Sequence, residues 1–155
     1  DEAKTMEPSA DYILPLGKAN TVLNADAVAI EDGCTACIIT YGMGVYWAKA
    51  AAKKFPGKLE IIDLRTLYPL DEDMIFSSVK KHGKCLVLSE EQQNNSFAEA
   101  LAHRISYHCF QHLDAPVEVL GALNVPAVPI NLILEAAMLP TVAKTEAAIA
   151  KLLAY

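Results

Sequence analysis

Four short runs of apolar, often β-branched residues are spread along the chain. They occupy residues 34–41, 59–64, 85–89 and 116–120. Nearly unbroken apolar runs of this length are typical of strands that are covered on both faces. Segments with helical patterns lie between and after them, at residues 45–55, 71–82, 96–110 and 141–153. Because parallel strands need helix-length crossovers, this alternation predicts an α/β fold with a mostly parallel sheet and helices on both faces.

Two of the predicted helices have clear end signals. Asp71 can cap the helix that follows it. Acidic residues in the first turn of this helix and basic residues in the last also suit the helix dipole. Gly83 then supplies the left-handed residue that commonly ends a helix. Ser96 and Glu99 have the spacing of a capping box, which predicts that the next helix begins there.

The first 32 residues are less regular. Residues 1–11 are polar and contain Pro8, which is typical of a linker. The chain begins with Asp1 rather than Met, so we expect a fragment of a longer polypeptide, with a processed or tag-cleaved start as the alternative. Residues 12–32 hold short apolar pieces separated by proline, glycine, asparagine and aspartate, so we expect irregular extended structure there. We therefore predict a linker or disordered segment at residues 1–11 and one domain at residues 12–155.

The composition limits the classes of function. With 155 residues, 53% of them apolar, the chain can build the core of one domain. Its net charge is −6, and it lacks the clustered Lys and Arg that nucleic-acid binding needs. No apolar run approaches the ~20 residues that span a bilayer, and four cysteines are too few for a disulfide scaffold. We expect a soluble, cytoplasmic protein that binds neither nucleic acid nor membrane.

One motif is similar to a dinucleotide-binding fingerprint. Gly42 and Gly44 lie between a predicted strand and helix, and Asp63 closes the next strand. The fingerprint also needs a third glycine for close packing of helix on strand, and Trp47 stands at that position. We therefore prefer a tight turn that needs small residues over a nicotinamide or flavin site.

Two further spacings are typical of metal or redox sites. Cys34 and Cys37 have C-x-x-C spacing, but the pair enters a strand, and a zinc site would need a second such pair. His108 and His112 lie four residues apart without the glutamate that metalloproteases place after the first histidine. We assign no catalytic, cofactor-binding or metal-binding residue in the chain.

A candidate ligand pocket lies where the first and third predicted strands end. Open α/β sheets usually bind ligands beyond the carboxyl ends of their strands. A polar loop at residues 92–96 follows the third strand and leads into a helix N-terminus, which could receive an anion. A solvated loop without a ligand is the favoured alternative. The residues of such a pocket would be Thr40, Tyr41, Gly42, Glu90, Glu91 and Ser96.

Three residues are predicted to have structural roles near the second strand. Arg65 follows this apolar strand, and long cations in such places are rarely buried without a partner. We expect its guanidinium to bond to a carboxylate or to backbone carbonyls and so fix the turn. Asp63 at the strand end and Asp71 at the helix cap complete this set.

Several ordered blocks resemble the C-terminal domain of the β subunits of thiamine-dependent 2-oxoacid dehydrogenases. The most specific is IIDLRTLYPLD at residues 61–71, which is similar to the family's V-I-D-L-R-T-L-x-P-L-D stretch. The family's P-x-G-K-A opening, its T-Y-G-x-x-V turn and the block before its last strand are matched at residues 12–19, 40–45 and 113–117. Residues 42–48 and 151–155 resemble the branched-chain, 2-oxoisovalerate type.

The resemblance implies the transketolase C-terminal fold, a three-layer α/β/α domain whose five-stranded sheet has one antiparallel member. It implies a non-catalytic assembly and docking role in an enzyme that decarboxylates a 2-oxoacid and acylates lipoamide. Thiamine diphosphate and magnesium would lie between other domains of the parent enzyme, and none of their ligands falls in this stretch. The implied partners are other domains or subunits of the dehydrogenase, in a homo- or hetero-oligomer, and the lipoyl acyltransferase core.

The chain departs from the family's pattern in two places. Residues 92–96 replace a glycine-rich turn, and residues 124–130 replace a D-x-P-x-P block. Both departures permit a divergent partner or substrate. A pyruvate- or acetoin-type β subunit is an alternative to the 2-oxoisovalerate type, and a transketolase or deoxyxylulose phosphate synthase fits less well. A free-standing α/β binding or regulatory module is the alternative from another class.

The apolar segment 122–139 is a candidate interface. Its prolines exclude a regular strand, so it must either cover the core as a lid or face a partner. The resemblance places it near subunit contacts, and we expect the isolated chain to associate through it. The alternative is that Ile130 and residues 132–134 pack down as a short core helix. The candidate interface residues are Val125, Pro126, Val128, Pro129 and Ile130.

Overall fold

The structure is a computed structural model that describes residues 9–155. Residues 1–8, which include most of the predicted linker, lie outside the described residues. The strands are β1 (Asn20–Leu23), β2 (Ala36–Thr40), β3 (Leu59–Asp63), β4 (Cys85–Gln92) and β5 (Glu118–Ala122). The helices are α1 (Ala27–Glu31), α2 (Met43–Ala52), α3 (Glu72–His82), α4 (Phe97–Cys109), the 3-10 helix η1 (Phe110–His112), α5 (Leu132–Met138) and α6 (Val142–Leu153).

The five strands form one mixed sheet in the order β1-β3-β2-β4-β5. β2 runs parallel to both β3 and β4, and β4 runs parallel to β5. Only β1, at one edge, is antiparallel to its neighbour. This arrangement confirms the expected mostly parallel sheet with one antiparallel member.

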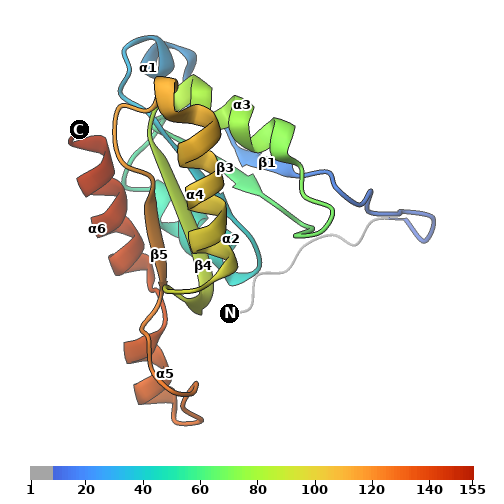
Figure 1. Cartoon of the computed structure of the whole chain (residues 1–155), viewed down its shortest axis with the longest axis vertical. Helices are drawn as coiled ribbons and strands as arrows, with labels where there is room; N and C mark the ends of the chain where they lie inside the picture. The colour runs from blue at the N-terminus through green and yellow to red at the C-terminus, as the bar shows by residue number, and fades with distance from the viewer. Residues whose placement is uncertain (1–8) are drawn as a thin grey trace.

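Helices cover both faces of the sheet, as Figure 1 shows. On one face α3 and α4 pack on the sheet through Ile75, Val79, Leu101 and Ile105. On the other face α2 and α6 form a second core that contains Ala48, Ala51, Ile149 and Leu152. The three-layer α/β/α prediction is therefore confirmed. No helix among residues 9–155 is long and apolar enough to cross a membrane.

The expectation of irregular structure at residues 12–32 is partly wrong. This stretch contains the edge strand β1 and the short helix α1. β1 is only four residues long, and its register with β3 is irregular between Thr21 and Leu23. α1 is positioned by a hydrogen bond from the Asp26 backbone N–H to the Gly57 carbonyl, at 2.8 Å. Pairing with the central sheet therefore orders a segment whose own sequence carries only weak strand and helix signals.

The predicted helix ends are confirmed. Asp71 Oδ1 accepts a hydrogen bond from the Met74 backbone N–H at 3.3 Å, so this side chain caps α3. Gly83, with φ +68°, ends the same helix in the left-handed conformation. Ser96 Oγ caps α4 by accepting from the Glu99 backbone N–H at 3.0 Å. The Glu99 carboxylate accepts in return from the Asn95 backbone N–H, at 2.6 Å.

The turn between β2 and α2 requires small residues, as expected from the sequence. Gly42 has φ +57°, a conformation that residues with a Cβ rarely adopt. A Cβ on Gly44 would lie 2.0 Å from Thr40 Oγ1, so α2 can begin directly above the end of β2 only because Gly44 has no side chain. The Trp47 side chain packs against the core between the sheet and the α2–α6 layer.

Candidate functional site

The carboxyl edge of the sheet brings Tyr41, directly after β2, next to Glu91 near the end of β4. Tyr41 OH donates a hydrogen bond to Glu91 Oε1 at 3.0 Å, and the same oxygen accepts from the Ala98 backbone N–H in the first turn of α4. The Tyr41 ring meets Phe97 edge to face, with ring centroids 5.9 Å apart. Burial, followed by the hydrogen bond and the negative charge of Glu91, raises the pKa of Tyr41 to about 12. Tyr41 is therefore a neutral hydrogen-bond donor near neutral pH.

The remaining residues of the predicted pocket do not converge on a common point. Thr40 Oγ1 is fully buried and has no hydrogen-bond partner among the described residues. Ser96 caps α4 and also donates to the Gln93 carbonyl. Gly42 forms the turn, and Glu90 is exposed to solvent. The edge thus contains one organised contact, Tyr41 with Glu91, rather than a set of convergent free groups.

These residues do not fit a diphosphate group. The carboxylates of Glu90 and Glu91 place negative charge at the edge, and the six predicted pocket residues include no cation. Among residues 9–155 there is also no group of three or more His, Cys, Asp or Glu side chains able to hold a metal ion. The six predicted pocket residues therefore do not suit thiamine diphosphate or magnesium.

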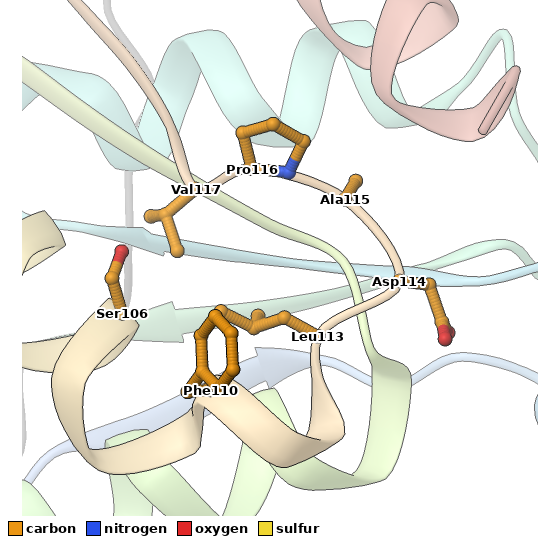
Figure 2. Close-up of a pocket in the computed structure, with 7 residues that line it drawn as sticks. All are labelled: Ser106, Phe110, Leu113, Asp114, Ala115, Pro116 and Val117. Carbon is orange, nitrogen blue, oxygen red and sulfur yellow. The ribbon is translucent and has the colours of Figure 1, made fainter.

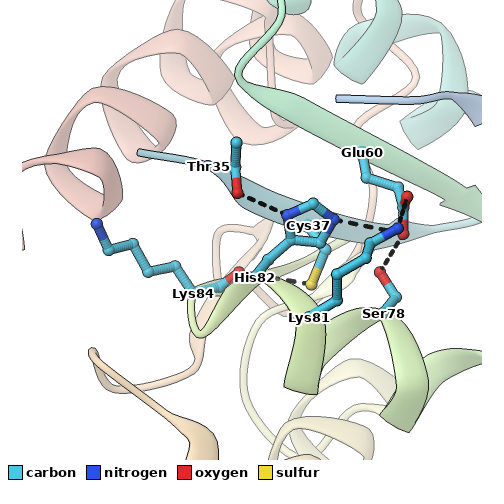
Figure 3. Close-up of polar contacts among 7 residues, drawn as sticks. All are labelled: Thr35, Cys37, Glu60, Ser78, Lys81, His82 and Lys84. Carbon is cyan, nitrogen blue, oxygen red and sulfur yellow. Dashed lines mark hydrogen bonds and ion pairs between the residues drawn. The ribbon is translucent and has the colours of Figure 1, made fainter. Parts of the chain in front are cut away.

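A buried polar cluster lies near the opposite edge of the sheet, and sequence reasoning missed it (Figure 3). Glu60 on β3 accepts from Ser78 Oγ at 2.7 Å and is paired with Lys81. His82 Nε2 lies 3.5 Å from Glu60 Oε1, and His82 Nδ1 shares a 2.7 Å hydrogen bond with Thr35 Oγ1. The available signal was Glu60 itself, because a charged residue inside an apolar strand needs buried partners.

The cluster fixes the charge of Glu60. Burial alone would raise the pKa of Glu60, but the nearby His82 imidazole and the hydrogen bonds from Lys81 and Ser78 outweigh it and lower the pKa to about 2. A hydroxyl, an imidazole and a carboxylate in series are also the groups of a hydrolytic triad. Thr35 is only 1% exposed and His82 only 3%, so no substrate can reach the hydroxyl. The cluster therefore ties the C-terminus of α3 to β2 and β3.

A cavity of about 490 Å³ lies between the end of α4 and the segment that leads into β5 (Figure 2). Its lining is mainly apolar, with Phe110, Leu113 and Val117 turned toward one another. Ser106 donates to the Ala102 carbonyl of its own helix. Asp114 points away from these apolar side chains. The cavity therefore lacks the convergent polar groups that chemistry would need.

The expectation for Arg65 is wrong. The residue is exposed, and its guanidinium pairs with no residue in the described part of the chain. Its backbone takes the role that was expected of the side chain. With φ +57°, Arg65 donates its N–H to Asp63 Oδ1 at 3.1 Å, so Asp63 holds the turn.

The predicted interface segment forms an arm, which we define as residues 123–139. Figure 1 shows that α5 and the loop before it project away from the sheet. Val128 is 58% exposed and Ile130 fully exposed, whereas Val125 and Pro129 are half-buried and Pro126 is exposed. The alternative of a packed core helix is wrong: residues 132–134 form a helix, but Leu132 and Ile133 are each 80% exposed.

Comparison with known proteins places the fold in a family. The family model described as "Transketolase, C-terminal domain" matches residues 25–145. The chain belongs to the transketolase C-terminal domain family. The region that matches the family model runs from just before α1 into α6. It includes the Tyr41–Glu91 contact, the buried cluster around Glu60 and the arm of this transketolase C-terminal domain.

The relatives include β subunits of 2-oxoacid dehydrogenases. The 2-oxoisovalerate dehydrogenase subunit beta of Bacillus subtilis (strain 168) is 34% identical over 94% of this chain and 43% of its own length. That of Pseudomonas aeruginosa PAO1 is 38% identical over 77% of this chain and 32% of its own length. β subunits of pyruvate dehydrogenase and of an acetoin oxidoreductase also match. This transketolase C-terminal domain thus spans less than half the length of these curated relatives.

A solved structure shows the same fold. The protein titled "Split gene transketolase, inactive beta4 tetramer" superposes with a TM-score of 0.71 at 18% sequence identity. The match covers 94% of this chain and 45% of that one. At this identity the likeness supports the transketolase C-terminal fold and nothing finer.

Proposed function

We propose that this chain is the non-catalytic assembly and docking domain of a thiamine diphosphate-dependent 2-oxoacid dehydrogenase. In this proposal, other domains or subunits hold thiamine diphosphate and magnesium and carry out decarboxylation and acylation of lipoamide. The domain contributes contacts to those subunits and to the lipoyl acyltransferase core. The 2-oxoisovalerate type is favoured, because both relatives described above in detail carry that name.

The arm is the observation that carries the proposal. Ile130, Leu132 and Ile133 are all at least 80% exposed, and α5 (LILEAAM) has Glu135 as its only charged residue. A helix with so large an apolar surface is usually covered by other protein. Exposed apolar patches of this kind mark sites of protein association. The arm therefore fits a contact that inserts into a neighbouring subunit.

The rest of the domain fits a supporting role. Tyr41 donates a hydrogen bond to Glu91, and Glu91 also accepts from the first turn of α4. Glu60 is surrounded by Ser78, Lys81 and His82. Groups that are engaged in this way stabilise the fold and are not free to bind or activate a substrate. This pattern supports a domain that presents surfaces rather than one that performs a reaction.

Sedimentation velocity of the 155-residue chain over a concentration range tests the proposal. We expect wild type to self-associate through the arm when other subunits are absent, and the Ile130→Ser/Ile133→Ser variant to sediment as a monomer. Val28→Ser is the matched control, because Val28 is 70% exposed but lies on α1, outside the arm. A wild-type monomer at every concentration would count against the proposal, as would equal association of wild type and the arm variant.

A further inference from the structure

The two ends of the arm lie close together where the arm joins the domain. At its base the Leu123 backbone N–H donates to the Met138 carbonyl at 3.1 Å, which brings the two ends of the arm together. Lys144 on α6 donates to the carbonyls of Ala137 and Leu139, at 2.9 and 2.7 Å. In the described part of the chain, α5 makes only sparse contact with other helices and strands. The direction in which the arm points therefore depends on its base.

The loop at residues 92–96 bonds directly to that base. Gln92 Nε2 donates to the Val125 carbonyl at 2.5 Å, and Asn124 Oδ1 accepts from the Asn94 backbone N–H at 3.1 Å. A backbone bond from Gln93 N–H to the Ala122 carbonyl, at 2.9 Å, lies beside them. Two side chains, one from the loop and one from the arm, thus join segments that are about thirty residues apart in the sequence.

Gly121 brings the two backbones into contact. A Cβ at this position would lie 2.7 Å from the Glu91 carbonyl oxygen and 2.9 Å from Gln93 Cα. Only glycine permits this approach, which places Gln92 and Asn124 within reach of their partners. Because β4 and Glu91 are fixed to β2 and α4 through the sheet and Tyr41, the loop connects the arm to a rigid part of the domain.

We propose that Gln92 and Asn124 are positioning residues that hold the arm in the orientation in which it docks. This inference rests on the proposed function of the arm. α5 has only seven residues, too few for an isolated helix to be stable, and Asn131 caps it through the backbone N–H groups of Ile133 and Leu134. A segment that is ordered before binding loses less conformational entropy when it binds. The two side chains thus lower the cost of docking without touching the partner.

Hydrogen–deuterium exchange of the dilute chain tests the clamp directly. In the Gln92→Ala/Asn124→Ala variant we expect amides at residues 125–138 to exchange about tenfold faster, because two hydrogen bonds of ordinary net strength are lost. Exchange in β2, β3 and β4 should not change. Asn94→Ala is the matched control, because Asn94 joins the clamp through its backbone N–H, which this substitution keeps.

Sedimentation of the same proteins tests the consequence for docking. Association of the double variant should be weaker by about tenfold, in line with the exchange result, whereas Asn94→Ala should associate like wild type. Unchanged exchange of the arm in the double variant would overturn the clamp, and so would equal acceleration in Asn94→Ala. If wild type itself does not associate, the proposed function fails, and the exchange experiment still decides whether the clamp exists.

Discussion

The carboxylate of Glu60 and the imidazole of His82 face each other across 3.5 Å in the interior of the domain. Glu60 lies on β3, and His82 is the last residue of α3, so the contact joins the sheet to the end of a covering helix. Lys81 and Ser78, also on α3, approach the same carboxylate. The pair therefore links the charge state of one buried side chain to the packing of α3.

Acidification should weaken the fold through Glu60. Its pKa is about 2 in the folded protein, below the ordinary value of 4.5. A lowered pKa stabilises the fold fully above the unfolded value, and this contribution is lost as pH falls from about 4.5 toward 2. The shift corresponds to about 3 kcal/mol at most. Urea unfolding at several pH values should show wild type losing stability across this range.

The Glu60→Gln variant separates this contribution from general acid denaturation. It should be less stable than wild type at pH 7 and should lose less stability between pH 4.5 and 2. Glu31→Gln serves as the control, because it removes one exposed carboxylate on α1 and leaves the Glu60 cluster in place. Identical pH profiles for wild type and Glu60→Gln would show that the cluster does not hold Glu60 charged.

Gly44→Ala should destabilise the domain by about 1–3 kcal/mol, the usual cost of overpacking a core. The added methyl would meet Thr40 Oγ1 at 2.0 Å and press against the Leu88 carbonyl at 3.2 Å. The Gly44→Ala/Thr40→Ala double variant should recover part of the loss, because the closest atom is gone while Leu88 remains. Thermal unfolding measures both, and full stability of Gly44→Ala would show that α2 is free to move.

Arg65 and Asp63 should respond in opposite ways to alanine. Arg65→Ala removes an exposed side chain without a partner among residues 9–155, so stability should change by less than about 0.5 kcal/mol. Asp63→Ala removes the acceptor of the Arg65 N–H and should cost about 1 kcal/mol. Chemical denaturation of the two variants makes the comparison. A larger loss for Arg65→Ala would mean that the side chain carries a contact within the domain.

The isolated chain should not bind thiamine diphosphate. Glu90 and Glu91 place carboxylates at the edge where an anion would have to bind, and no cation stands among the predicted pocket residues. Calorimetric titration with the cofactor in the presence of magnesium should give only heats of dilution. Saturable binding in the micromolar range would show that the domain holds part of a cofactor site.

Much of the sheet could be predicted because both of its faces are covered. The central strands β2, β3 and β4 are mostly apolar along their buried lengths, and such runs stand out in a sequence. β1 could not be predicted in the same way. It is short, ends at the exposed Leu23, and is defined by its pairing with β3. Its strand character is a property of the neighbour as much as of its own residues.

The candidate site could be predicted only in part. Tyr41 follows β2 and Glu91 lies near the carboxyl end of the neighbouring strand β4, so their meeting could be expected from the rule for parallel sheets. The partners of Glu60 lie on a different element, and only the fold shows which residues they are. The exposure of Ile130 and Leu132 was equally hidden, because the same apolar residues suit a packed helix and a docking helix.

The most direct test of the account follows deuterium exchange of the arm as a function of protein concentration. If the chain associates through α5, amides at residues 123–139 become protected as the concentration rises, while those of α1 do not. The Ile130→Ser/Ile133→Ser variant should show no such protection. Unchanged exchange of the arm at all concentrations, in samples that sedimentation shows to be associated, would contradict docking through α5.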